Sequence, residues 1–317
     1  MKKLCFAFLA LLMLCALVSC VQESPEPLVD FEALKAGPRT LVSTEDLNGY
    51  VFAVYSDDTA ELVSIDEEKF PKALTLPSFY EDYPIVAIGK EVFKDTNFTS
   101  VILSSGIERI GDRAFQNSAI ESIVIHDGVK ELGTDLFENC LRLQKVSFGA
   151  GVKNLPTGVC FSCPVLSEVT FSEGLESIGE EAFGDCSALK ELALPSTLKE
   201  IGPYAFWRAS LEKTSVPAGV SSVGIGAFRQ TPWLEAKTEE WVLVGDGVLL
   251  DYNGTEKDVT LPEEVKYLSD AFQGKSLDRL TLPDTLLAIA PEALEETVVG
   301  DVIYNEENEA ISAYFKK

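Results

Sequence analysis

The sequence of 317 residues contains little of what most catalytic and nucleic-acid-binding sites require. It has a single histidine, the side chain most used for metal coordination and for acid–base catalysis at neutral pH. Basic residues are also scarce, because 26 lysines and arginines are outnumbered by 51 aspartates and glutamates, for a formal net charge of −25. Such a surface repels phosphate backbones, so nucleic acid is a poor partner, and contact with an anionic bilayer face is disfavoured.

Common catalytic signatures are missing as well. The chain has no phosphate-binding Gly-x-x-x-x-Gly-Lys-Ser/Thr loop, no His-Glu-x-x-His motif and no calcium loop of spaced aspartates. Carboxylates are abundant, but no spacing singles out a pair for glycoside hydrolysis. His126 follows a predicted strand at a surface turn, where no motif supplies a serine or cysteine partner. We therefore expect a protein that is not an enzyme and that needs no metal or cofactor.

The N-terminus carries export signals. Lys2 and Lys3 precede an apolar run over residues 4–18, which fits a signal peptide and is short for a transmembrane helix. The run ends in Leu17-Val18-Ser19-Cys20, which resembles the bacterial lipobox and implies lipidation of Cys20. The alternative is an ordinary cleaved signal with a chance cysteine. We predict a lipoprotein signal peptide over residues 1–19, a tether over residues 20–40, and an exported envelope lipoprotein at the outer membrane or cell surface, held to the membrane only by its lipid.

The rest of the chain is repetitive. The phrase Ile-Gly-x-x-Ala-Phe and its variants recur with a period of 22 or 23 residues, and the aromatic residue stands at positions 93, 115, 137, 183, 206, 228 and 272, with two gaps that each span two periods. A second phrase, Leu-x-x-Val-x-Leu-Pro, keeps the same period, as at residues 189–195 and 277–283. Its alternation is that of a strand with one buried face. One such unit cannot bury its own apolar face, so the units must stack into a leucine-rich-repeat solenoid.

The full unit closely resembles the BspA-like leucine-rich-repeat family of bacterial and some protist cell-surface proteins. The resemblance extends over about residues 74–299. It implies a β-rich solenoid with short turns or helical segments between the strands. Known members of the family include adhesins that bind host extracellular proteins, so the resemblance also implies a binding role.

The ends and the interruption of the repeat suggest the domain plan. Alternating residues at 48–55 and 60–63 predict an N-terminal capping hairpin within a cap over residues 41–73. The solenoid is expected over residues 74–300, with a hairpin insert near 234–256 around Gly245-Asp246-Gly247. Residues 301–317 are expected to form a C-terminal cap or tail.

The cysteines follow the repeat rather than a disulfide framework. Cys140, Cys163 and Cys186 lie one period apart, in a column that elsewhere holds small residues, and Cys160 stands where other coils have phenylalanine. Cys160 and Cys163 form a Cys-x-x-Cys motif, but no second pair or histidine completes a metal site. We therefore interpret the column as a buried ladder, while a disulfide between neighbouring coils stays geometrically possible.

Two surfaces are candidates for ligand binding. Outward positions of the predicted strands form a column that begins with Ile102 and Val124 and holds mostly small residues, which would leave a flat sheet, although such a face can also be merely solvated. Trp207 occupies a surface slot beside Tyr204 and Arg208 and is expected to be exposed, the alternative being packing against a neighbouring loop. The candidate ligand-binding residues are Ser147, Thr170, Ala193, Ser215, Tyr204, Trp207 and Arg208.

These features predict a lipid-anchored, monomeric solenoid that presents one face to a protein or glycan ligand. The alternative is a structural or scaffold component of an envelope complex that has no soluble ligand. A solenoid offers a long continuous face, which is how repeat proteins commonly bind their partners.

Overall fold

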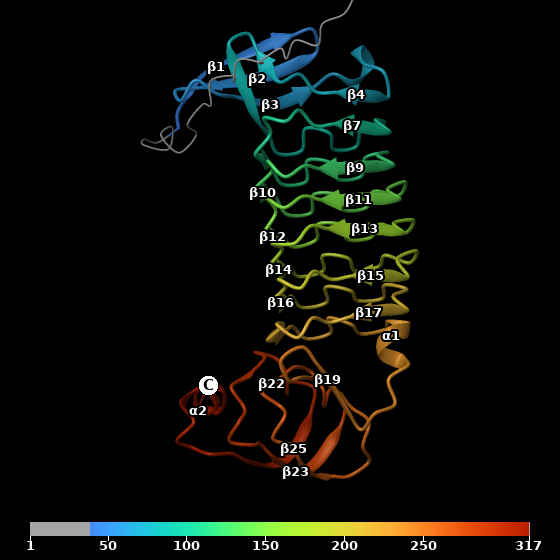
Figure 1. Ribbon diagram of the computed structural model, residues 1–317, viewed down its shortest axis with the longest axis vertical. Helices are drawn as coiled ribbons and strands as arrows, with labels where there is room; N and C mark the ends of the chain where they lie inside the picture. Colours follow the sequence, from blue (N-terminus) through green and yellow to red (C-terminus); the bar gives the residue numbers. More distant parts are fainter. Residues whose placement is uncertain (1–38, 317) are drawn as a thin grey trace, which may run out of the picture. The chain divides into compact units, whose positions relative to one another are not determined.

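The computed structural model describes residues 39–316. The expected signal peptide, the lipidation site Cys20 and residues 21–38 of the expected tether lie outside the described residues. Within the described body the chain winds through stacked coils, and each regular coil adds one strand to each of two lines of parallel strands (Figure 1). The predicted repeat solenoid with its N-terminal hairpin is confirmed.

The first line consists of the longer strands, in which apolar residues alternate with outward-facing ones. Equivalent residues one period apart are direct neighbours, as Lys145 is to Ser122 and Glu168. These strands are β4 (Ala73–Thr75), β7 (Ser100–Ile102), β9 (Ser122–Ile125), β11 (Lys145–Phe148), β13 (Glu168–Phe171), β15 (Glu191–Ala193), β17 (Lys213–Ser215), β21 (Asp258–Thr260), β23 (Ser276–Thr281) and β25 (Val298–Ile303).

The second line passes through the Ile-Gly phrase of each coil and is made mostly of two-residue strands. Gly133 shows why glycine follows the strand, because an added Cβ would lie 2.1 Å from the backbone nitrogen of Asp112 in the neighbouring coil. The strands are β6 (Tyr83–Ile88), β8 (Arg109–Ile110), β10 (Glu131–Leu132), β12 (Asn154–Leu155), β14 (Ser177–Ile178), β16 (Glu200–Ile201), β18 (Ser222–Val223), β20 (Val248–Tyr252), β22 (Tyr267–Leu268) and β24 (Ala288–Ile289).

The two ends of the described body differ from the regular coils. At the N-terminal end β1 (Leu41–Leu47), β2 (Tyr50–Tyr55) and β3 (Ala60–Ile65) pair antiparallel, and β3 joins β6 in parallel. A 3-10 helix (Glu67–Lys69) and β5 (Phe79–Tyr80) follow. At the C-terminal end the helix α2 (Glu309–Phe315) is capped by the side chain of Asn308 and buries Ile311.

The regular stack is interrupted once between coils. The short helix α1 (Pro232–Glu235) leads into β19 (Trp241–Val244), which pairs antiparallel with β20 inside the range expected for an inserted hairpin. β20 then pairs in parallel with β22, so the second line of strands resumes after the hairpin. Between residues 39 and 316, no helix has the length and hydropathy needed to cross a bilayer.

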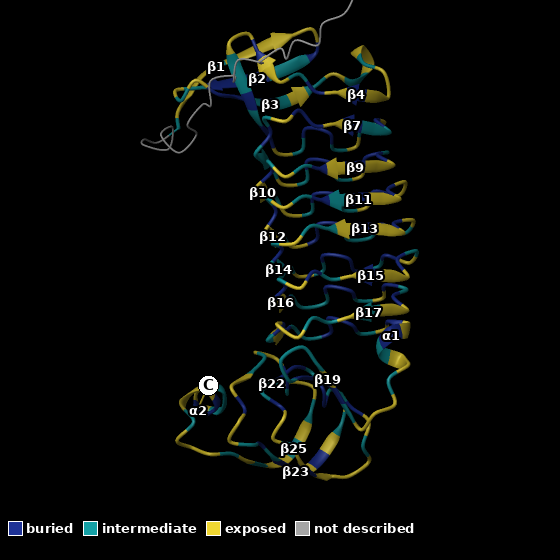
Figure 2. Cartoon of the chain, in the orientation of Figure 1, coloured by how far each residue is buried: buried dark blue, intermediate teal, exposed yellow. Residues whose placement is uncertain are grey.

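The core contains a column of stacked phenylalanine rings. Figure 2 colours the buried residues of the chain dark blue. Phe93, Phe115, Phe137, Phe183 and Phe206 are fully buried, and neighbouring rings in this column lie 4.8–5.8 Å apart between centroids. Cys160 fills the same slot between Phe137 and Phe183 and is also fully buried. The smaller side chain explains why the ring stack is interrupted there.

The cysteine column is buried beside these rings. Cys140, Cys160, Cys163 and Cys186 are free thiols. Two of them donate to a carbonyl oxygen of the preceding coil: Cys140 Sγ to Phe115 O at 3.0 Å and Cys163 Sγ to Phe137 O at 3.1 Å. Burial raises the pKa of the Cys140 thiol to about 11 and that of Cys186 to about 12. Neutral buried thiols of this kind are poor nucleophiles and poor metal ligands.

A third line of inter-coil contacts follows the turns that carry the phenylalanines. In each regular turn two residues four positions apart adopt left-handed backbone angles, as Glu181 and Asp185 do at φ of 53° and 56°. With this backbone conformation, every second amide N–H of the turn points toward the next coil. Phe183 N–H thus donates to Ala205 O at 2.8 Å, and Asp185 N–H donates to Trp207 O at 2.8 Å.

Candidate ligand-binding surfaces

The strand face is formed by outward side chains of the longer strands. Four of the predicted site residues lie on it in neighbouring pairs, Ser147 beside Thr170 and Ala193 beside Ser215. The Thr170 hydroxyl donates to Ser147 Oγ at 2.8 Å. Thr170, Ala193 and Ser215 are exposed, whereas Ser147 is half-buried. The backbone ladder breaks between β13 and β15, so the two pairs belong to separate sheets.

Charged residues border this face in pairs along the same strands. Lys145 Nζ lies 2.5 Å from Glu168 Oε1, and Lys213 Nζ lies 2.5 Å from Glu191 Oε1. The hydrogen bond that Lys213 donates to the Glu191 carboxylate raises the pKa of Lys213, which favours the charged ammonium. Because these pairs are exposed, they contribute little to stability, and their effect is to balance the charge of the surface.

The beginning of the strand face is apolar, which the selection of site residues from sequence missed. Ile102 and Val124 are 59% and 63% exposed, next to one another on β7 and β9. They lie in a depression of about 390 Å³ that Ser122, His126 and Lys145 also line. The available signal was an isoleucine and a valine at outward strand positions, where later coils carry Ser, Thr or Ala.

His126 forms a wall of this depression and is engaged by its neighbours. Its Nε2 lies 2.9 Å from Ser104 O, and the N–H of Gly128 donates to its Nδ1 at 3.1 Å. Both ring nitrogens are therefore occupied by backbone groups, with Nε2–H as the donor. The arrangement holds the imidazole in place, and it leaves no ring nitrogen for a substrate.

The aromatic edge consists of Tyr204, Trp207 and Arg208 on one turn. The rings of Tyr204 and Trp207 meet edge to face at 6.4 Å, and the Arg208 guanidinium lies 5.0 Å from the Trp207 ring centroid. Arg208 also forms an ion pair with Asp185 at 3.3 Å. The structure brings all three predicted residues together, with Arg208 exposed.

Trp207 is half-buried, which corrects the prediction that it is exposed. Its slot is occupied one coil earlier by Gly184 and one coil before that by Phe161. A Cβ at Gly184 would lie 3.0 Å from the Phe161 ring, so that ring covers the glycine. The Tyr204 ring covers Gly226 of the following coil in the same way. Glycines thus make room for aromatic rings, and Phe161 extends the aromatic surface.

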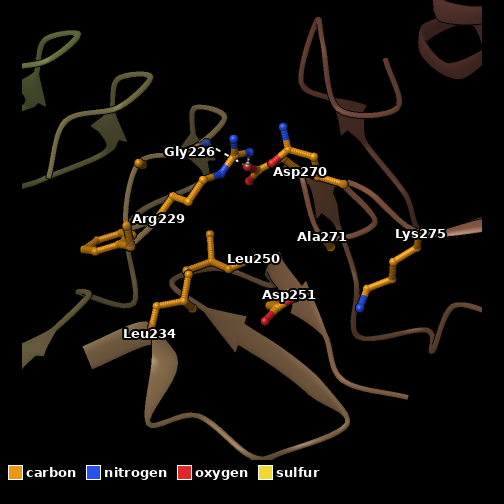
Figure 3. A pocket seen from close by; sticks show the side chains of 11 residues that line it. Gly226, Arg229, Leu234, Leu250, Asp251, Asp270, Ala271 and Lys275 are labelled. Carbon is orange, nitrogen blue, oxygen red and sulfur yellow. Dashed lines mark hydrogen bonds and ion pairs between the residues drawn. The ribbon is translucent and has the colours of Figure 1, made fainter. Parts of the chain in front are cut away.

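A slot opens where the hairpin interrupts the coils. Its volume is about 170 Å³, and Phe228, Arg229, Leu234, Leu250 and Lys275 are among the residues that line it. Arg229 Nη2 donates to Asp270 Oδ2 at 2.5 Å across the slot (Figure 3). Sequence reasoning did not find this slot, because its walls come from turns 44 residues apart.

The described residues offer surfaces for binding more readily than groups for catalysis. Among residues 39–316, no group of three or more His, Cys, Asp or Glu side chains is placed to hold a metal ion. Acidic turns border the aromatic edge, where burial and then Glu180 raise the pKa of Glu181. Flat strand surfaces, an apolar depression and aromatic–arginine clusters are features of protein and glycan interfaces.

Similar proteins are bacterial leucine-rich-repeat proteins. A leucine-rich repeat protein from Eubacterium ventriosum matches with a TM-score of 0.53 and 28% identity over 62% of this chain and 52% of that one, so this chain spans about half the length of that relative. A leucine rich cell surface protein from Faecalibacterium prausnitzii and the pneumococcal vaccine antigen PcpA each match 84% of the chain at 19% identity, over 78% and 71% of their own lengths, with TM-scores of 0.44 and 0.43. No curated protein matches the chain.

The family assignment follows from the repeats themselves. Residues 86–181, 158–240 and 251–315 match the model described as BspA type leucine rich repeat region, in six copies. These matches extend over more than half of the chain and include the coils that form both candidate surfaces. The chain belongs to the BspA-type leucine-rich-repeat family.

Proposed function

We propose that this chain is a non-enzymatic binding protein of the bacterial cell envelope that presents its strand face to a protein or glycan ligand. The observation that carries the proposal is the strand face itself, in which exposed Ile102 and Val124 continue into the small residues Ser147 and Thr170. Exposed aliphatic side chains on a sheet are costly in water unless a partner covers them. Small neighbours let a partner surface approach the backbone closely.

The aromatic edge is the second candidate contact surface. Trp and Arg are enriched at the centres of protein interfaces, and here Arg208 stacks on Trp207. Trp207 is already partly buried by its own chain, so less surface remains for a partner than on the strand face. We therefore rank the strand face first.

The proposal is tested with paired charge insertions. The chain and its variants are titrated against an array of purified host extracellular proteins and envelope glycans. For any ligand that binds saturably, we expect the double variant Ser147→Arg with Thr170→Arg to lower the affinity by about tenfold or more, as substitutions at the centre of an interface do. Asn154→Arg with Ser222→Arg is the matched control, because it adds the same charge to exposed positions of the short-strand sheet.

The aromatic edge has its own variant, Tyr204→Ala with Trp207→Ala. If both the strand-face and the aromatic-edge variants keep the fold and bind every ligand as the unmodified chain does, neither surface is the binding site. A chain that binds nothing in the array but co-purifies stoichiometrically with envelope proteins would instead support the scaffold role.

The membrane anchor is proposed separately, since Cys20 lies outside the described residues. We expect Cys20→Ala to move the protein from the membrane fraction to the soluble fraction, because lipidation would supply the bilayer attachment. Cys5→Ala in the expected signal peptide is the control and should leave the protein in the membrane fraction. A Cys20→Ala protein that stays in the membrane after its signal is cleaved would contradict the lipoprotein assignment.

A further inference from the structure

The hydrogen-bond ladder along the turns ends at residues 226–230. In the six preceding turns, three amide N–H groups donate to three carbonyl oxygens of the next coil, at 2.7–3.1 Å. One period after this turn, however, residues 248–252 form β20 of the inserted hairpin. The N–H of Gly226 donates instead to Asp270 Oδ2 at 2.8 Å. Within residues 39–316, the N–H groups of Phe228 and Gln230 have no acceptor.

The amide of Phe228 is the more unusual of the two. Phe228 is 2% exposed, and a buried N–H without a partner is rare because it loses its hydrogen bond to water on folding. The equivalent amide one coil earlier, that of Phe206, donates to Ala227 O at 2.8 Å. The missing partner is therefore a consequence of the hairpin and not of the turn's own conformation.

The direction of the ladder makes this end electropositive. The three inter-coil amides of each turn donate toward the C-terminal end of the stack, so the dipoles of these peptide groups point the same way, as they do in a helix. The exposed positive end of such an array is the N–H end, which binds anions in helices and in backbone nests. Here the carboxylate of Asp270 already accepts a hydrogen bond from the first of the three amides, that of Gly226.

The open amide of Phe228 belongs to a residue that lines the slot described above, and Gln230 directly follows the lining residue Arg229 in the sequence. Phe228, Arg229 and Lys275 all line the slot, and Figure 3 shows Arg229 on one side of it and Lys275 on the other. Arg229 is paired with Asp270, whereas Lys275 has no carboxylate within ion-pair distance in the described part of the chain. Asp251 also lines the slot, and its Oδ1 accepts the N–H of Tyr252 at 2.9 Å.

We propose that this slot binds a carboxylate group of a partner polypeptide. The two carboxylate oxygens accept the N–H groups of Phe228 and Gln230, and Lys275 balances the added charge. The volume of about 170 Å³ admits a carboxylate-bearing group rather than a folded segment. This site is separate from the strand face and does not depend on it.

The proposal is tested by amide NMR on the ¹⁵N-labelled chain. Acetate is the first probe, with chloride at equal ionic strength as its control. We expect saturable downfield shifts of the Phe228 and Gln230 amides and no shift of the Phe206 amide, which keeps its partner. Three capped peptides then separate the sources of the carboxylate: one with a free C-terminus, one amidated with a single glutamate, and one amidated without any carboxylate.

Two variants move the affinity in opposite directions. Lys275→Gln should weaken acetate binding by about tenfold, the effect of losing one charged contact. Asp270→Asn should strengthen it, because the competing carboxylate is removed and Arg229 is released. If these residues had a purely structural role, the two substitutions would not change the acetate affinity in opposite directions.

The outcomes are decisive in each case. Saturable shifts at Phe228 and Gln230 that disappear with the carboxylate-free peptide support the proposal. Absence of saturable shifts with every carboxylate probe, or equal shifts at Phe206, overturns it. If Asp270→Asn does not fold, Lys275→Gln decides alone: unchanged acetate affinity in that variant removes Lys275 from the site and contradicts the proposal as stated.

Discussion

Replacing Phe183 by alanine should lower the free energy of unfolding by about 3–5 kcal/mol, as for other large buried aromatics. Phe183 is fully buried, its ring stacks on Phe206 at 5.8 Å, and it meets Phe171 edge to face at 6.0 Å. On its other side the column holds Cys160, which is too small to fill the space that the ring leaves. The measurement is the urea midpoint and slope of the purified protein.

The damage should extend to adjacent coils. Each coil is stabilised mainly by its two neighbours, so a weakened coil loosens both interfaces. Hydrogen exchange of the turn amides of Phe183, Asp185 and Phe206 should therefore accelerate together. Phe79→Ala is the matched control, because that phenylalanine is 60% exposed and its truncation should change stability little. Equal midpoints for the two variants would show that the phenylalanine column is not the core.

Gly133→Ala should destabilise the protein by about 3 kcal/mol or more, at the upper end of the usual cost of overpacking. The added Cβ would lie 2.1 Å from Asp112 N and 2.4 Å from Gly111 C. Both are backbone atoms of the neighbouring coil, so no side chain can rotate away to relieve the contact. The coils must separate, which lengthens the hydrogen bond from Gly133 N–H to Ile110 O, now 2.7 Å.

Gly219→Ala provides the comparison for this experiment. Gly219 is exposed, and its added Cβ would come no closer than 3.6 Å to Leu198 O. Its stability should stay within about 0.5 kcal/mol of the unmodified protein. Similar thermal and urea midpoints for the Gly133 and Gly219 variants would mean that coil spacing does not depend on the glycine of the Ile-Gly phrase.

The core of this protein was predictable because a repeat shows the environment of each position many times. Phenylalanine at one slot in seven coils, and small residues in the cysteine column, identify buried positions without any knowledge of the neighbouring chain. The outward strand positions follow from alternation in the same way, and Thr170 and Ser215 lie exposed where the pattern places them. The period also explains the Cys-x-x-Cys motif, because Cys160 and Cys163 occupy two buried columns of the repeat and both are free thiols.

Trp207 shows where periodicity stops being informative. Its slot holds charged or polar residues in most coils, and these residue types predict exposure. The degree of burial is instead decided by which side chains fill the adjacent space, here the Tyr204 ring and the Arg208 guanidinium. Such contacts depend on the particular side chains of this turn and not on the repeating unit.

The amino-acid sequence alone therefore determined the coil, its period and its buried columns, because the same positions of successive repeats carry the apolar side chains that must be buried. Only the tertiary structure decided which surface groups meet across coils and where the ladder of turns ends. The free amides of Phe228 and Gln230 result from a hairpin in the place of one turn, and the Gly226 amide of the same turn donates instead to Asp270, 44 residues away. Contacts of that kind depend on the stacking distance between coils, which no single repeat encodes.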